Sequence, residues 1–247
     1  MYQALHYDFR NRTCHLRDDK QGWLSFEYQP TYYKLDPNGK YETLDGKRVS
    51  PTNTCDKNDP LTYYEIDIPM ETRVLVDAYK DLDNAPDYHN VLFLDIECEI
   101  GGALTTEYIK SAPMKITSIA LYDVTLKKYY CLVLDEKKQL NYTYEDNKEI
   151  IPCFHETELL SKFIDLWVNA DPTIITGWNS EFFDIPYLYH RICKVLGEKE
   201  AKKLSPLGIT SVRDFFNKKT QTNESVVNIA GVNHLEIGRA HVWTPVT

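Results

Sequence analysis

Two hydrophobic periods alternate along the chain after residue 90. Short apolar or β-branched runs are typical of buried strands, and apolar residues at helical spacing are typical of helices that cover a sheet. The strand candidates are 91–94, 115–122, 128–134 and 173–176, and the helix candidates are 159–168 and 182–196. A short polar link between the second and third strands predicts a hairpin. Strands that alternate with covering helices predict an α/β layer.

The first part of the chain has a different pattern. Residues 1–88 carry short aromatic and β-branched runs separated by turn residues such as Pro37-Asn38-Gly39, which predicts a β-rich domain. Residues 81–90 are polar, contain a proline and show no periodicity, as expected of a linker. We therefore expect two domains, 1–88 and 89–235.

Composition excludes several classes of protein. The 247 residues are 43% hydrophobic and 26% charged, which excludes a disordered or fibrous chain. The sequence has no run of eighteen apolar residues and no basic, then apolar, N-terminal segment, so we expect neither a membrane span nor a secretory signal. Its six cysteines form no CxxC pair, which disfavours a zinc site or a disulfide framework. Reduced thiols and a cytoplasmic location, in a host cell if the source is viral, are expected.

The charge balance argues against a protein that coats nucleic acid non-specifically. There are 28 basic and 37 acidic residues, a net charge of −9. An enzyme that acts on nucleic acid is still compatible, because metal ions offset the carboxylates that bind them. Basic residues gather between Arg191 and Lys219. They predict either phosphate contacts or an ordinary solvated helix face.

Three carboxylates stand where the predicted strands end. Asp95 and Glu97 are two residues apart, so on a strand their side chains share one face. An isolated pair of this kind is more often just an exposed acidic strand end. Asn179, Phe183 and Asp184, however, follow the next strand and its turn, and such junctions are where α/β sheets build ligand sites. The pattern predicts that carboxylates from separate elements meet.

These residues carry a family resemblance. The segment VLFLDIE (91–97) resembles the first exonuclease motif of family B DNA polymerases. The segment ITGWNSEFFDIPYL (175–188) resembles the second, whose pattern is Asn, three residues, Phe, Asp. Residues 28–33 and 205–208 are also similar to family segments, so the likeness extends nearly to Leu235.

The likeness is greatest to the tailed-phage and large-virus branch. That branch has a β-hairpin before its third motif, which residues 212–217 and 225–229 would supply here. The resemblance implies an RNase H-like (DnaQ-like) 3′–5′ proofreading exonuclease domain. Its fold would be α/β, with a mixed sheet and flanking helices, preceded by the β-rich N-terminal domain.

The resemblance also implies the chemistry. Two divalent ions, Mg²⁺ or Mn²⁺, would activate a water molecule and stabilise the leaving oxygen, and such hard ions prefer carboxylate ligands. By position, Asp95 would bridge both ions, Glu97 would bind one and orient the water, and Asp184 would hold the other. Asn179 and Phe183 would either support the metal ligands or contact the DNA strand, although core packing explains Phe183 at least as well.

Further expectations concern DNA and protein partners. From the basic residues around the hairpin we expect Arg213, Lys218 and Lys219 to contact DNA. The implied substrates are the 3′ end of single-stranded DNA and primer–template DNA, with deoxynucleotides for the full-length enzyme. The resemblance also implies a sliding clamp that would bind through a C-terminus beyond this chain.

The sequence departs from the family in two places. The third motif, a tyrosine with an aspartate four residues later, does not follow Asp184, and the polymerase segments are absent. Residues 236–247 resemble the translation of a common sequencing adapter, with Trp243 at its stop codon. We therefore expect a truncated N-terminal polymerase fragment with poor activity, and a non-native tail with no structural role.

Two other functions are compatible with these motifs. One is a free-standing exonuclease of the DEDD type, which differs from the first hypothesis only in lacking a polymerase domain. The other is a single-stranded-DNA-binding module that keeps the fold without turnover. Metal-dependent release of nucleotides separates the second alternative from both enzymes.

Overall fold

The computed structural model describes residues 1–82, 85–99, 101–103, 105–218 and 221–237. The chain forms two compact units, Met1–Asp87 and Tyr88–Thr247, and the division falls within the polar segment 81–90. Each unit has its own hydrophobic cluster. In the described residues, no helix is long and apolar enough to cross a membrane.

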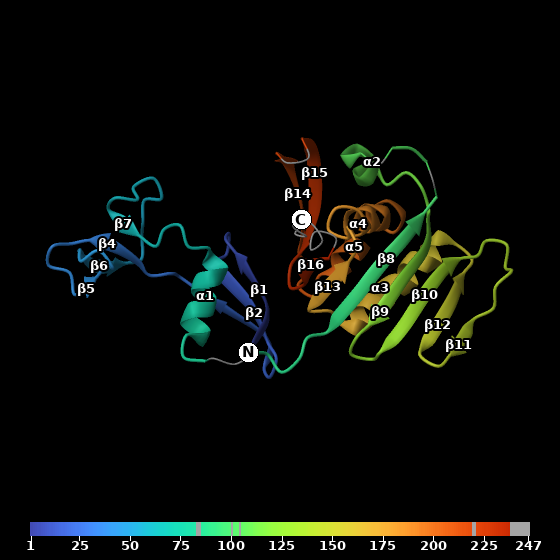
Figure 1. The fold of residues 1–247 in the computed structure, drawn as a ribbon, viewed down its shortest axis with the longest axis horizontal. Helices are drawn as coiled ribbons and strands as arrows, with labels where there is room; N and C mark the ends of the chain where they lie inside the picture. Colours follow the sequence, from blue (N-terminus) through green and yellow to red (C-terminus); the bar gives the residue numbers. More distant parts are fainter. Residues whose placement is uncertain (83–84, 100, 104, 219–220, 238–247) are drawn as a thin grey trace, which may run out of the picture. The chain divides into compact units, whose positions relative to one another are not determined.

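Unit 1 contains two small antiparallel sheets (Figure 1). The first has the order β1-β2-β3 and the second the order β5-β6-β4-β7. Their strands are β1 (Tyr2–Asp8), β2 (Thr13–Asp18), β3 (Gly22–Glu27), β4 (Tyr32–Leu35), β5 (Tyr41–Glu42), β6 (Arg48–Thr52) and β7 (Tyr63–Tyr64). The strand content agrees with the β-rich pattern.

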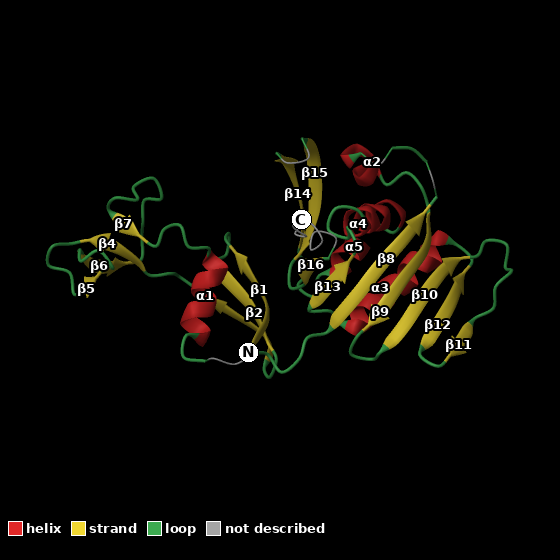
Figure 2. Cartoon of the chain, viewed as in Figure 1, coloured by secondary structure: helices red, strands yellow, loops and turns green. Residues whose placement is uncertain are grey.

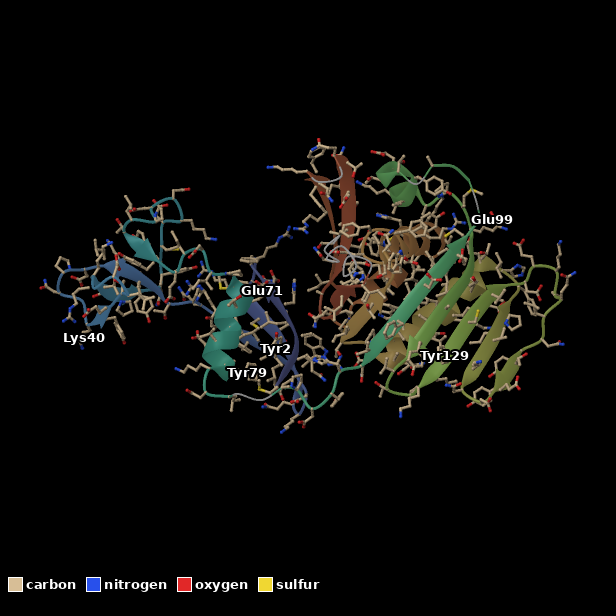
Figure 3. All side chains as sticks on the ribbon, viewed as in Figure 1. Tyr2, Lys40, Glu71, Tyr79, Glu99 and Tyr129 are labelled. Atoms are coloured by element: carbon tan, nitrogen blue, oxygen red, sulfur yellow. The ribbon has the colours of Figure 1, made fainter. Side chains whose placement is uncertain are left out.

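Helix α1 (Met70–Tyr79) was not expected in unit 1. It contacts β1 and buries Val74 in a core with Tyr7, Cys14 and Leu16. Tyr79 lies near Tyr2 of β1, with ring centroids 6.1 Å apart (Figure 3). The aromatic and β-branched residues around this short amphipathic stretch hid its helical period.

Unit 2 is built on one mixed seven-stranded sheet of order β11-β12-β10-β9-β8-β13-β16 (Figure 2). Its strands are β8 (Val91–Cys98), β9 (Ile116–Asp123), β10 (Lys128–Leu134), β11 (Thr143–Glu145), β12 (Lys148–Cys153), β13 (Ile174–Gly177) and β16 (Asn233–Glu236). β13 runs parallel to both β8 and β16, whereas β9 is antiparallel to its two neighbours. The expected α/β class with a mixed sheet is confirmed.

Helices α3 (Glu156–Ala170) and α4 (Asp184–Val195) cover one face of this sheet. The shorter helices of unit 2, α2 (Thr106–Ser111) and α5 (Glu198–Ala201), contact α4, and a 3₁₀ turn spans Lys202–Leu204. α3 lies behind the sheet in Figure 2 and buries the predicted apolar stripe from Leu159 to Trp167, whereas Val168 at its end is exposed. At its end, the indole of Trp167 donates to the Leu204 carbonyl at 2.8 Å. The opposite face is more open, and carries Tyr129, which is 46% exposed (Figure 3).

The hairpin expected from the resemblance is present and longer than its sequence pattern indicated. β14 (Thr210–Asn217) pairs antiparallel with β15 (Thr222–Ile229) as a separate two-stranded sheet. Strand β12, which pairs parallel with β10, was not predicted. Its sequence KEIIPC contains a proline and two charges, which lower the strand signal.

Candidate active site

Strand β8 places the first two carboxylates on its open face. Leu92, Leu94 and Ile96 are at most 5% exposed and belong to the core of unit 2. Asp95 and Glu97 are exposed on the opposite face, as strand alternation requires. A buried apolar row thus fixes the strand, and the two acids project from its other side.

Asp184 reaches the same strand from the first turn of α4. Its side chain is 3% exposed, and its Oδ1 accepts a hydrogen bond from the backbone N–H of Ile96 at 3.0 Å. β13 pairs with β8 only from Val91 to Phe93. Ile96 pairs with Ile119 of β9 on one side, but on the side of β13 it is opposite no residue of that strand. The carboxylate supplies the acceptor that the neighbouring strand does not.

The turn between β13 and α4 depends on two residues of the second motif. A Cβ atom on Gly177 would lie 2.4 Å from the Leu94 carbonyl oxygen, so the turn passes β8 too closely for a side chain. Asn179 has a φ of 55°, the left-handed region that asparagine tolerates better than most residues. Its carbonyl accepts from the N–H groups of Phe182 and Phe183 at 3.2 and 3.0 Å. This turn directs Asp184 back toward β8.

Glu236 supports the turn from the edge strand. It is paired with Gly177 in the parallel register of β16 and β13. Its two carboxylate oxygens accept from the N–H groups of Asn179 at 2.8 Å and Glu181 at 3.1 Å. The expectation that the segment from residue 236 has no structural role is therefore wrong at this position. Residues 238–247 of that segment lie outside the described residues.

Three carboxylates line one hollow of about 430 Å³. Asp95, Asp184 and Glu236 contribute acidic groups, and the aromatic side chains of Trp178, Phe182 and Phe183 surround them together with Ile96 and Asn179. Burial raises the pKa of Asp184 to about 6, and the negative charges of Asp95 and Glu236 add to this effect. The Ile96 N–H opposes the shift. A hollow that accumulates unbalanced negative charge is suited to a cation.

The fit to divalent metal ions is good in ligand type and incomplete in arrangement. Carboxylate oxygens are the ligands that Mg²⁺ and Mn²⁺ prefer. Within the part of the chain that is described, no group of three or more His, Cys, Asp or Glu side chains is close enough to hold a metal ion. Asp95 and Asp184 share the hollow, whereas Glu97 is not among its lining residues.

The predicted DNA-contacting residues divide into two groups. Asn179 and Phe183 line the hollow, and Phe183 also packs against Tyr187 with ring centroids 5.6 Å apart. Arg213 and Lys218 are exposed on the hairpin and do not line the hollow. Lys219 lies outside the described residues.

Most of the basic stretch between residues 191 and 219 is engaged within the protein. Arg191 is 7% exposed and pairs with Glu156 through two contacts of 2.7 and 2.6 Å. It also donates to the carbonyl of Ala112 at 2.9 Å. Lys202 and Lys203 form ion pairs with acids on their own helical segment. The phosphate-contact interpretation is wrong for Arg191, whose role is to join α3 and α4.

Sequence reasoning missed other residues at this site. Trp178 and Phe182 line the hollow, and Tyr187 anchors α4 by accepting from the N–H of Met114 at 3.0 Å and donating to its carbonyl at 2.8 Å. The tryptophan and the phenylalanine stand within the second motif and could have been proposed from it. The roles of Tyr187 and Glu236 depend on contacts across the sheet, for which the sequence has no local signal.

Comparison with protein families identifies this arrangement. The sequence model described as DNA polymerase family B, exonuclease domain, matches residues 33–238. The chain belongs to this family. The match includes both motifs and all of the hollow's lining residues.

Individual relatives of this exonuclease domain are DNA polymerases. The DNA-directed DNA polymerase of Enterobacteria phage T4 is 26% identical over 248 residues, 88% of this chain and 27% of the relative. That of Escherichia phage RB69 is 38% identical over 86 residues, 35% of this chain and 9% of the relative. The DNA polymerase delta catalytic subunit of Dictyostelium discoideum is 25% identical over 142 residues, which are 58% of this chain and 12% of the relative. The chain thus spans about a quarter or less of these relatives' lengths.

Proposed function

We propose that unit 2 is a metal-dependent 3′–5′ exonuclease that removes nucleotides from the end of single-stranded DNA. The observation that carries the proposal is the convergence of Asp95 and Asp184 in a hollow walled by aromatic side chains. Aromatic rings stack on bases of any sequence, and acidic groups bind the ions that hydrolyse phosphodiesters. Membership of the family supports the same reaction.

Two Mg²⁺ or Mn²⁺ ions would be held by Asp95, Asp184 and Glu97. Bound there, they would activate a water molecule and neutralise charge on the leaving oxygen. The protein's own contribution is position: the Ile96 N–H holds one oxygen of Asp184 beside β8. Trp178, Phe182 and Phe183 would hold the terminal bases against these carboxylates. An RNase H-like arrangement of the mixed sheet belongs to the same proposal.

The larger protein would be a family B replicative DNA polymerase, in which this unit proofreads. Its substrates would then include primer–template DNA and deoxynucleotides, with a sliding clamp as partner and the host cytoplasm as location. Support for this wider role comes from the names of the relatives, of which the chain matches only a part.

The test is hydrolysis of a 5′-labelled single-stranded oligonucleotide by the purified chain with Mn²⁺ or Mg²⁺. We expect stepwise shortening from the 3′ end, and at least a hundredfold loss in the Asp95→Ala/Glu97→Ala variant, of the order found when catalytic groups are removed. Glu145→Ala, an exposed acid on β11, is the matched control. Calorimetric titration with Mn²⁺ adds a readout independent of turnover. Equal nucleotide release by the double variant and the parent would refute the assignment.

A non-catalytic single-strand-binding module is the second candidate. It is favoured by one observation, the lack of a three-carboxylate cluster among the described residues. The same assay decides between the two. Binding of the oligonucleotide by the parent without any metal-dependent shortening would establish the module and exclude the enzyme.

A further inference from the structure

A groove next to the carboxylate hollow is lined by residues of α2 and of the β14–β15 hairpin. Figure 1 labels these two elements. Its volume is about 620 Å³, within the range of ordinary ligand sites. Asn179, Phe182 and Phe183 line both the groove and the hollow, so the two are adjacent. A strand whose end lies at the carboxylates would therefore extend through this groove.

The hairpin wall of the groove is held by different forces at its two ends. At its base, Val227 and Ile229 are buried in the core of unit 2, and the hydroxyls of Tyr189 and Thr210 are 3.1 Å apart. Further out, the described strands of the hairpin form a sheet of their own, with no backbone pairing to the seven-stranded sheet. There it meets α2 through polar contacts.

Two polar contacts join α2 to the hairpin. The Lys110 ammonium lies 2.7 Å from a carboxylate oxygen of Asp214 on β14. These two side chains line a neighbouring hollow and not the groove itself, so the pair acts on the groove only by joining α2 and the hairpin, which form its walls. The Thr106 hydroxyl donates to the backbone carbonyl of Asn223 on β15. Lys110 and Asp214 are 39% and 58% exposed, so this ion pair contributes little to the stability of the fold. It can nevertheless hold the outer part of the hairpin in place.

We propose that the Lys110–Asp214 ion pair is a latch that sets the width of this groove and so positions the substrate strand behind its cut end. The inference rests on the proposed function and names positioning residues for the same site. Opening the latch leaves the carboxylate hollow intact but loosens one wall of the groove. Only a substrate long enough to reach the groove is then bound less well.

The negative charge of Asp214 makes the effect of its removal on DNA binding a test of this proposal. DNA is negative, so removing the negative Asp214 should tighten binding if long-range charge alone mattered. The latch predicts the opposite, because the loss of Asp214 frees the hairpin. The Lys110→Asp/Asp214→Lys exchange keeps the net charge and rebuilds the pair in reverse.

The binding experiment uses an Asp95→Asn background, so that the strand is not degraded. Fluorescence anisotropy gives Kd for an oligonucleotide of about ten nucleotides and for a dinucleotide. In Asp214→Ala we expect the Kd for the ten-nucleotide strand, divided by the Kd for the dinucleotide, to rise about two- to fivefold. This is the upper limit for the loss of an exposed ion pair. The exchanged pair should restore the ratio. Glu136→Ala is the control, because it breaks the Lys115–Glu136 pair of 2.6 Å and similar exposure elsewhere in unit 2.

With Asp95 restored and Mn²⁺ present, the same change should appear in KM for the long oligonucleotide and not in kcat. Melting temperatures of all variants establish that each is folded. The latch is refuted if Asp214→Ala binds the long strand equally or more tightly, if both probes weaken alike, or if the exchanged pair fails to restore binding. If the parent cleaves nothing, the proposed function fails, and the anisotropy ratio still decides the latch.

Discussion

The buried carboxylate of Asp184 lowers the stability of the fold when it is ionised. Its carboxylate is buried beside Asp95 and Glu236, and its pKa is raised to about 6 from an ordinary value of 3.8. Between pH 3.8 and about 6, Asp184 is therefore protonated in the native state and ionised in the unfolded state. Stability from this group is present at low pH and is lost as the pH rises through about 6.

This sign gives a prediction for Asp184→Asn in EDTA. At pH 8 the variant should be more stable than the parent by about 2 to 3 kcal/mol, because each pKa unit corresponds to about 1.4 kcal/mol. Below about pH 4 the advantage should vanish, since the parent's side chain is then neutral. Urea unfolding at several pH values measures the difference. A constant difference across this range would contradict the assignment of the effect to ionisation.

At the scale of elements, the buried Arg191–Glu156 pair holds α3, α4 and the segment before β9 together. Glu156 Oε1 also accepts from the N–H of Ile116 at 2.9 Å, and Arg191 also donates to the carbonyls of Ala112 and Pro113. Both side chains are less than 9% exposed. Removing one partner leaves the other as an uncompensated buried charge.

We therefore expect Arg191→Met and Glu156→Gln each to lower the free energy of unfolding by about 3 to 5 kcal/mol. The double variant should lose less than the sum, because neither charge is then left alone. Lys203→Met, which breaks the exposed pair with Glu200, is the control and should cost less than about 1 kcal/mol. Chemical denaturation measures all four. Additive losses would show that the two side chains are not coupled.

At the scale of the whole molecule, the separate hydrophobic clusters imply that unit 2 can fold alone. Its cluster draws residues from strands β8, β9, β10 and β13, from the hairpin, and from α3 and α4. A fragment starting at Tyr88 should therefore unfold cooperatively and retain near-UV circular dichroism. It should also retain the nuclease or binding activity of the whole chain on oligonucleotides. A fragment with secondary structure but no cooperative transition would show that residues 1–87 are needed for its core.

Much of this protein could be predicted from short stretches of its sequence. Strand alternation predicts the run that ends in Asp95 and Glu97, and helical spacing predicts the apolar stripe of α3. The turn from Gly177 to Asp184 follows from backbone positions that glycine and asparagine tolerate. These rules act within a few residues, so the class of fold could be predicted without a structure, as could the meeting of carboxylates from separate elements, Asp95 and Asp184; Glu97, predicted with them, does not line the hollow. α1 and β12 were missed because their local signals are weak.

Only the tertiary structure decided which groups meet. Asp184 bonds to Ile96, 88 residues away, because β13 stops pairing with β8 just before that point. Glu236 supports the turn through the parallel register of β16, and Arg191 is an internal ion-pair partner and not part of a phosphate-binding strip. Lys110 of α2 pairs with Asp214 of β14, 104 residues away, a contact that neither segment encodes by itself. Such contacts depend on how strands end and how helices pack over the sheet, and residue periodicity carries no information about either.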